Sequence, residues 1–237
     1  QYYSDAKNFK LISKRESKPR NTNYSKESTA PKTVQSPSAE RKMSDKRIPV
    51  KDRCAAYFAV IDTETNSSDQ VMSIGCCIAN ADNFQPIDAK YIVLTPEFEI
   101  GGMYENTLFI ETPVAPVLCT RAEACSDLRH WLVSHGVTSI FAYNACFDRN
   151  HLPELRDFNW FDIMRMAAYR QHNPKIPASA ECCSTGRMKR GYGVEPMLRL
   201  LSGKCTYTET HNAFHDALDE LTIMKLLGHR LSEYLPL

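Results

Sequence analysis

Apolar residues gather into short runs from residue 57 onward, whereas the residues before them show no hydrophobic periodicity. The runs at residues 57 to 62, 71 to 80 and 89 to 95 are compact, and turn-rich segments separate them. Runs of this length and spacing are typical of β-strands joined by turns. We therefore expect the folded part to begin with a meander of three antiparallel strands.

Further along the chain, apolar residues recur at helical spacing between shorter apolar runs. The predicted elements are a helix over 121 to 135, a strand over 138 to 144, a short helix over 146 to 156, a strand running into a helix over 160 to 170, and helices over 194 to 203 and 213 to 231. This order predicts an α/β fold, with a mixed β-sheet in which further parallel strands join the meander and α-helices flank it.

The composition is that of an ordinary soluble globular protein, with 43% hydrophobic and 24% charged residues, which excludes a collagen or a coiled coil. No apolar run approaches the roughly 18 residues of a membrane span, so we expect no membrane partner. The nine cysteines lack paired C-x-x-C motifs and form an odd number. Free thiols in a reducing compartment explain them better than disulfides, which predicts a cytoplasmic location.

The net charge of +1 conceals two different segments. Residues 1–53 carry 14 Lys and Arg against 6 Asp and Glu, a net of +8, which leaves 15 against 22, a net of −7, for residues 54–237. The first segment is polar, basic and interrupted by prolines, so we expect a disordered tail. It would serve as a solvated linker or as an arm that attracts nucleic acid. Since the chain begins with Gln1, it is compatible with a piece of a larger polypeptide.

The first candidate site residues are Asp62 and Glu64, which directly follow the apolar residues 58 to 61. Because side chains alternate across a strand, both carboxylates point to the same side at the strand's C-terminal end. Two carboxylates on one face attract a hard divalent cation. A pair of solvated acids at a strand end is the alternative.

Two more carboxylates and a histidine occur in related contexts. Asp148 lies in the first turn of a predicted short helix, and Asp216 lies near the start of the last helix, five residues after His211. Acids in a first helical turn are also favoured simply by the helix dipole. A lone histidine at this position is compatible with a surface or capping role.

Together these motifs resemble those of the DnaQ-like DEDDh 3′-5′ exonuclease family, over residues 54 to 233. The D-x-E motif of the family matches Asp62 and Glu64, its N-x-x-F-D motif matches Asn144 to Asp148, and its H-x-x-x-x-D motif matches His211 and Asp216. Asn212 stands where the neighbouring subgroup of the family has a tyrosine, which favours the histidine subgroup. The resemblance implies an RNase-H-like fold, with residues 54–237 as the exonuclease domain.

The resemblance also implies the roles of these residues. The four carboxylates, Asp62, Glu64, Asp148 and Asp216, would hold two Mg²⁺ or Mn²⁺ ions that clamp the attacking and leaving oxygens of a phosphoryl displacement. His211 would act as general base, because an imidazole accepts a proton near neutral pH. The implied activity is hydrolysis from the 3′ end of single-stranded DNA or RNA, releasing nucleoside 5′-monophosphates.

Six further residues are expected to contact substrate. Three of them adjoin the catalytic motifs, and three lie in the long segment 171 to 193: Thr63, Thr65, Asn144, Arg187, Lys189 and Arg190. A basic segment beside glycines and a tyrosine suits phosphates and bases, although a solvated loop has the same composition. The family often continues its first motif with Thr-Gly, whereas this chain continues with Thr-Asn.

Two other functions are compatible with parts of the sequence. His211, His215 and Asp219 recur every four residues and could form a zinc-binding stripe, but Asn212 occupies the position where an H-E-x-x-H hydrolase needs glutamate. The stronger alternative is a catalytically inactive RNase-H-like module that binds nucleic acid or a protein. Retention of all four acids and the histidine favours the nuclease. The sequence does not predict the oligomeric state.

Overall fold

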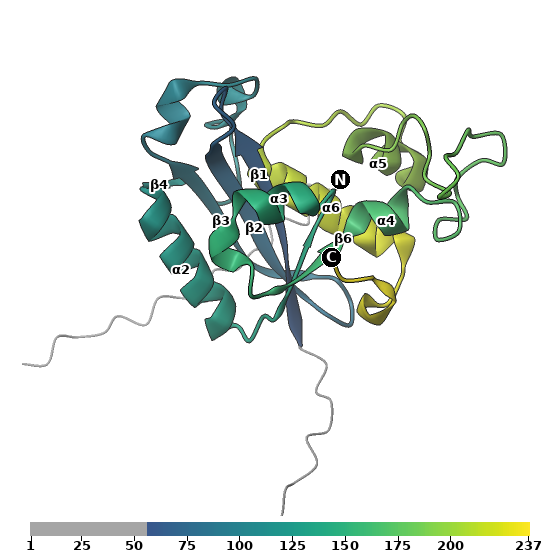
Figure 1. Cartoon of the computed structure of the whole chain (residues 1–237), viewed down its shortest axis with the longest axis horizontal. Coiled ribbons are helices and arrows are strands. Elements are labelled where there is room, and N and C mark those ends of the chain that lie inside the picture. Colours follow the sequence, from purple (N-terminus) through teal and green to yellow (C-terminus); the bar gives the residue numbers. More distant parts are fainter. Residues whose placement is uncertain (1–55) are drawn as a thin grey trace, which may run out of the picture. The chain divides into compact units, whose positions relative to one another are not determined.

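A computed structural model of the chain describes residues 56–237 (Figure 1). The basic segment 1–53, predicted to be a disordered tail or linker, lies outside the described residues. The described strands are β1 (Tyr57–Thr65), β2 (Val71–Asn80), β3 (Pro86–Leu94), β4 (Val117–Cys119), β5 (Ser139–Ala142) and β6 (Asn159–Asp162). The first three overlap the three apolar runs of the predicted meander, although β1 ends three residues later and β3 begins three residues earlier than predicted.

One sheet contains all six strands, in the order β4-β3-β2-β1-β5-β6. The pairs β1–β2 and β2–β3 are antiparallel, whereas β1–β5, β5–β6 and β3–β4 are parallel. The predicted mixed sheet, a three-stranded meander joined by parallel strands, is therefore confirmed. Strand β4 was not predicted, because its three residues are too few to give a pattern and two of them are exposed.

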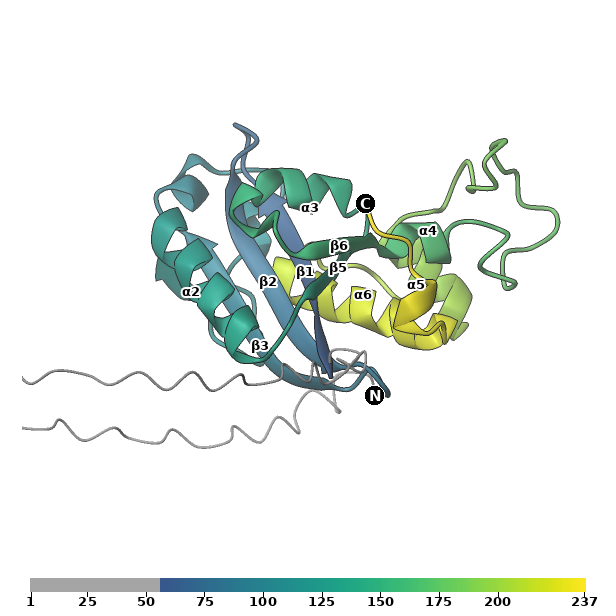
Figure 2. The same ribbon diagram turned by 60° about the horizontal axis from the view of Figure 1, so that its bottom comes forward.

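Helices cover both faces of the sheet (Figure 2). The α-helices are α2 (Arg121–Ser134), α3 (Cys146–His151), α4 (Ile163–Ala167), α5 (Val194–Ser202) and α6 (Ala213–Leu227), and short 3₁₀ helices occupy Glu97–Ile100, Glu105–Thr107, Pro153–Leu155 and Leu231–Glu233. Helix α2 packs against one face through Leu128 and Leu132, while α4, α5 and α6 cover the other. Two apolar cores result, one on each side of the sheet.

Local sequence explains where these helices begin and end. Thr120 and Glu123 form a reciprocal capping box at the start of α2. Gly228 ends α6 in a left-handed conformation, so that helix stops before the predicted residue 231. The predicted helix over 146 to 156 divides into α3 and a 3₁₀ turn, because Pro153 cannot continue an α-helix.

None of the helices within residues 56–237 is both long and apolar enough to cross a membrane. The eight cysteines from Cys76 to Cys205 are free thiols, as the sequence predicted for them.

Candidate metal centre and active site

Alternation along β1 decides which way its two acids point. Phe58 and Val60 belong to the core beneath α6, whereas Ala59 and Ile61 belong to the core beneath α2. Continuing this alternation places Asp62 and Glu64 together on the α6 side, beyond the apolar core. The predicted shared face of the two carboxylates is thus present.

A glycine on the neighbouring strand brings α6 close to these acids. Gly75 of β2 pairs with Asp62 across the ladder, and a Cβ atom on Gly75 would lie 2.0 Å from the carbonyl oxygen of Ala213. The first turn of α6 therefore rests on bare backbone, and a carboxylate oxygen of Asp216 in that turn comes within 4.8 Å of one from Glu64 of β1. Gly75 is needed here for close approach of the backbone rather than for a special φ.

Asp148 reaches the same place from α3, where it lies in the first turn as predicted and is only 2% exposed. The hydroxyl of Thr63 donates a 2.8 Å hydrogen bond to Oδ1 of Asp148. Thr63 was predicted to contact substrate. The structure buries it and directs its hydroxyl to the carboxylate, so that it holds Asp148 in position.

His211 is held by the residues around it. Its φ of 51° lies in the left-handed region, and the hydroxyl of Thr107 donates to its carbonyl oxygen. The next residue, Asn212, caps α6 by accepting from the backbone N–H groups of Phe214 and His215. The imidazole stacks on the ring of Tyr104, with centroids 4.1 Å apart and planes at 16°. Tyr104 was not anticipated, because nothing in the segment between β3 and β4 links it to the histidine by sequence.

Ligand atoms from Glu64, His211 and Asp216 lie within 4.8 Å of one another, which is close enough to share one metal ion, whereas Asp62 and Asp148 lie outside this group. Burial, together with neighbouring negative charges, raises the pKa of the Glu64 carboxyl to about 8 and that of Asp216 to about 9. Burial is also the largest cause of the raised pKa of Asp148, about 7, and of Asp62, which lies well above its ordinary range.

Buried carboxylate oxygens in this cluster lack hydrogen-bond partners. They are Oδ2 of Asp62, Oδ1 of Asp216 and Oε2 of Glu220. Unpaired buried carboxylates are costly unless a proton or a cation neutralises them. Oxygen donors of this kind are the preferred ligands of Mg²⁺ and Mn²⁺. The residues present therefore fit a divalent cation.

The remaining residues predicted from the first two motifs lie around the cluster. Asn144 is exposed, has a φ of 62°, and occupies the turn between β5 and α3, where its backbone N–H donates to Asp162. Phe147, also in α3, is 38% exposed beside the ring of His151. Thr65 is half-buried at a register shift that ends β1. Asn144 and Phe147 leave polar and aromatic surface beside Asp148.

The long loop 171 to 193 lies next to α5. The guanidinium of Arg187 lies 4.7 Å from the centroid of the Tyr192 ring, and Lys189 is 3.8 Å from Glu181. Arg190 is exposed. The hydroxyl of Tyr143, at the end of β5, donates to the carbonyl oxygen of Tyr192, which ties the end of this loop to the sheet.

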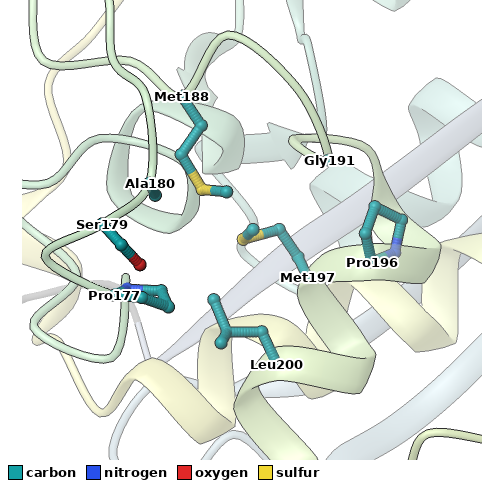
Figure 3. A pocket seen from close by; sticks show the side chains of 8 residues that line it. All are labelled: Pro177, Ser179, Ala180, Met188, Gly191, Pro196, Met197 and Leu200. Carbon is teal, nitrogen blue, oxygen red and sulfur yellow. The ribbon is translucent and has the colours of Figure 1, made fainter.

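This loop and α5 line an open, mostly apolar pocket of about 270 Å³ (Figure 3). The side chains of Met188 from the loop and Met197 and Leu200 from α5 point into it. None of the four predicted carboxylates lines this pocket. It is therefore separate from the metal centre.

The zinc-binding stripe gains no support from the described part of the chain. Asp219 accepts a hydrogen bond from the hydroxyl of Tyr207, and His215 lies 3.4 Å from the hydroxyl of Thr210. Within residues 56–237, neither of them belongs to the group of potential metal ligands that contains His211.

Comparison with known proteins supports the fold assignment. No protein-family model matches the sequence, and no curated protein matches it significantly. Among solved structures, the nuclease domain of 3'hExo, a DEDDh family member bound to rAMP, is similar with a TM-score of 0.55 and 14% identity, over 78% of this chain and 98% of that one.

A second solved structure, of a 3′-exonuclease in 3′-end-specific recognition of a histone mRNA stem-loop, is similar with a TM-score of 0.52 and 13% identity. The alignment covers 77% of this chain and 91% of that one. The chain thus has the RNase-H-like α/β fold of DEDDh nuclease domains, as its motifs predicted.

Proposed function

We propose that this protein is a metal-dependent 3′-5′ exonuclease that shortens single-stranded RNA or DNA and releases nucleoside 5′-monophosphates. One observation carries the proposal. Glu64, His211 and Asp216 bring ligand atoms within 4.8 Å of one another at the end of β1, the negative charges of Asp62 and Asp148 act on the same place, and buried oxygens of Asp62 and Asp216 have no hydrogen-bond partner. Buried carboxylates without partners are costly, and a module that only binds nucleic acid would gain nothing from them.

In this proposal Asp62, Glu64, Asp148 and Asp216 would hold two Mg²⁺ or Mn²⁺ ions. The bound ions would supply positive charge to neutralise the charge that develops on the scissile phosphate. His211 accepts the proton of the attacking water through its imidazole, and Tyr104 keeps that ring in position by stacking on it.

The substrate class follows from the similar structures and from charge. One similar structure holds rAMP and another concerns a histone mRNA stem-loop, which supports RNA as a substrate. The net charge of −7 on residues 54–237 favours short single-stranded ends over a long duplex, because neutralising many phosphates needs many cationic side chains. In the same proposal, Asn144, Thr65 and the basic residues of loop 171 to 193 contact the strand, and the protein acts in the cytoplasm.

The test uses single-stranded RNA and DNA oligonucleotides labelled at the 5′ end, incubated with Mg²⁺, with Mn²⁺ or with EDTA. We expect a ladder that shortens from the 3′ end only when a divalent cation is present. The variants Asp148→Asn and His211→Ala should abolish the ladder, while Asp157→Asn, an exposed acid paired with Arg129, should not. A folded wild-type protein that binds oligonucleotide without cutting it would establish the inactive binding module instead.

A further inference from the structure

Asn212, the residue that caps α6, is fully buried and uses every hydrogen-bonding group of its side chain. Its Oδ1 atom accepts from the backbone N–H groups of Phe214 and His215. Its Nδ2 group donates to the hydroxyl of Tyr91 at 2.8 Å and to the carbonyl oxygen of Thr107 at 2.7 Å. A helix cap needs only the oxygen, so the two bonds from the amide nitrogen point to a second role.

The two acceptors of this amide hold the segment that follows Tyr104. Thr107 ends the 3₁₀ helix that begins directly after Tyr104. Tyr91 lies on β3, and its hydroxyl donates in turn to the carbonyl oxygen of Leu108 at 2.7 Å. The Asn212 amide therefore ties the start of α6 to the residues that follow Tyr104.

His211 lies at the junction of these tied elements. Its φ of 51° is in the left-handed region, which a residue with a side chain keeps only where its surroundings hold it there. The hydroxyl of Thr107 donates to its carbonyl oxygen, and its imidazole stacks on the ring of Tyr104. Both the backbone and the ring of His211 thus contact the segment to which Asn212 is bonded.

We infer that Asn212 is a positioning residue for His211, whose buried amide fixes the start of α6 against the segment of Tyr104 and so keeps the imidazole on that ring. Serine, threonine and aspartate also cap helices, but only asparagine among the strong caps adds two N–H donors to the capping oxygen. The inference deepens the proposed function, and it rests on that function only for the use of His211 as general base.

The test is the NMR chemical shift of the His211 ring protons in the full chain, assigned by comparison with His211→Ala. The ring current of an aromatic face moves protons held above it upfield, so the His211 signals of the wild type should lie upfield of their ordinary positions. Tyr104→Ala should return them to those positions. Wild-type signals at their ordinary positions would overturn the inference.

Asn212→Ser keeps a capping oxygen and removes both amide donors, so we expect it to lose most of the upfield shift. Asn173→Ser is the matched control. Asn173 is also buried, at 1% exposed, its amide donates to the carbonyl oxygen of Ala167, and its Oδ1 accepts from the N–H of Lys175. Asn173→Ser should lower the melting temperature about as much as Asn212→Ser does and keep the His211 signals in place.

A folded Asn212→Ser protein that keeps the full upfield shift would overturn the inference, as would an equal loss of shift in Asn173→Ser. If Asn212→Ser does not fold, Tyr91→Phe replaces it, because that variant removes one acceptor of the amide and leaves the cap intact. Tyr91→Phe should reduce the upfield shift, and an unchanged shift would overturn the inference in the same way.

Oligonucleotide cleavage by the same preparations separates this inference from the proposed function. We expect Asn212→Ser to lower kcat about tenfold with little change in KM, because a displaced imidazole loses part of its general-base contribution. Loss of the upfield shift without any cleavage by the wild type supports the positioning of His211 and overturns the exonuclease. Cleavage by the wild type with equal kcat and an unchanged shift in Asn212→Ser overturns the role of Asn212 alone.

Discussion

Replacing Gly75 by alanine should move Asp216 of α6 away from the acids of β1. The added Cβ would lie 2.0 Å from the carbonyl oxygen of Ala213, whereas real contacts of this kind stay above 3.0 Å, so the start of α6 must move by about 1 Å. Asp216, one turn into α6, moves with it, while Asp62 remains on β1. A misplacement of about 1 Å in a catalytic arrangement can cost roughly 100-fold in rate.

The same substitution overpacks the interface between α6 and the sheet, at a cost of about 1–3 kcal/mol. For a domain of this size, that lowers the melting temperature by about 2–12 °C and leaves it folded at 20 °C. The assay is the initial rate of Mn²⁺-dependent shortening of a labelled oligonucleotide, alongside Mn²⁺ affinity. Gly193→Ala is the control, because a Cβ there would be 3.9 Å from its nearest neighbour. A folded Gly75→Ala variant with wild-type rate and affinity would refute the view that contact at Gly75 sets the site.

Three further predictions follow from the site. Without divalent ions, the free energy of unfolding should fall as pH rises from about 4 through about 9. The pKa values of Asp148 and Asp216 are raised to about 7 and about 9 in the folded protein, so over this range the folded state keeps protons that the unfolded chain releases. Urea unfolding in EDTA at several pH values measures this dependence, and saturating Mn²⁺ should remove it. A free energy of unfolding that rises with pH in EDTA would contradict the prediction. Tyr104→Ala should lower the single-turnover rate constant about tenfold, because His211 loses its stacking partner and part of the general-base contribution is lost. Tyr104→Phe keeps the ring and should keep the rate constant. Equal rate constants for the wild type and Tyr104→Ala would show that the stack is irrelevant. Thr63→Val removes the hydroxyl that is bonded to Asp148 and should weaken Mn²⁺ binding by about tenfold. Thr63→Ser keeps a hydroxyl and should bind Mn²⁺ like the wild type. Unchanged affinity in Thr63→Val would mean that this bond does not position Asp148.

The parts of the fold that sequence predicts are those with a strong local pattern. The three meander strands are long apolar runs between turns, and their predicted and observed ranges agree closely. Asp62, Asp148 and Asp216 stand at strand ends and helix starts that the local pattern predicts. Local sequence was therefore enough to predict the elements that carry these acids, although tertiary contacts at Thr63 and Gly75 position Asp148 and Asp216.

Residues whose role depends on tertiary contact could not be found in this way. In the sequence, Gly75 looks like any glycine in a strand, and only the structure shows that the backbone of α6 packs directly on it. Tyr104 reaches His211 from a segment without regular pattern.

Manganese placed by anomalous scattering is the most direct test of the metal centre. Crystals of the protein soaked with Mn²⁺ and a nucleoside 5′-monophosphate should show anomalous peaks among the carboxylates of Asp62, Glu64, Asp148 and Asp216, with the phosphate of the nucleotide beside them. The same soak of Asp148→Asn should weaken or remove a peak. Saturating Mn²⁺ with no peak at the end of β1, or with the nucleotide bound elsewhere, would contradict the assignment of this cluster as the site of phosphodiester hydrolysis.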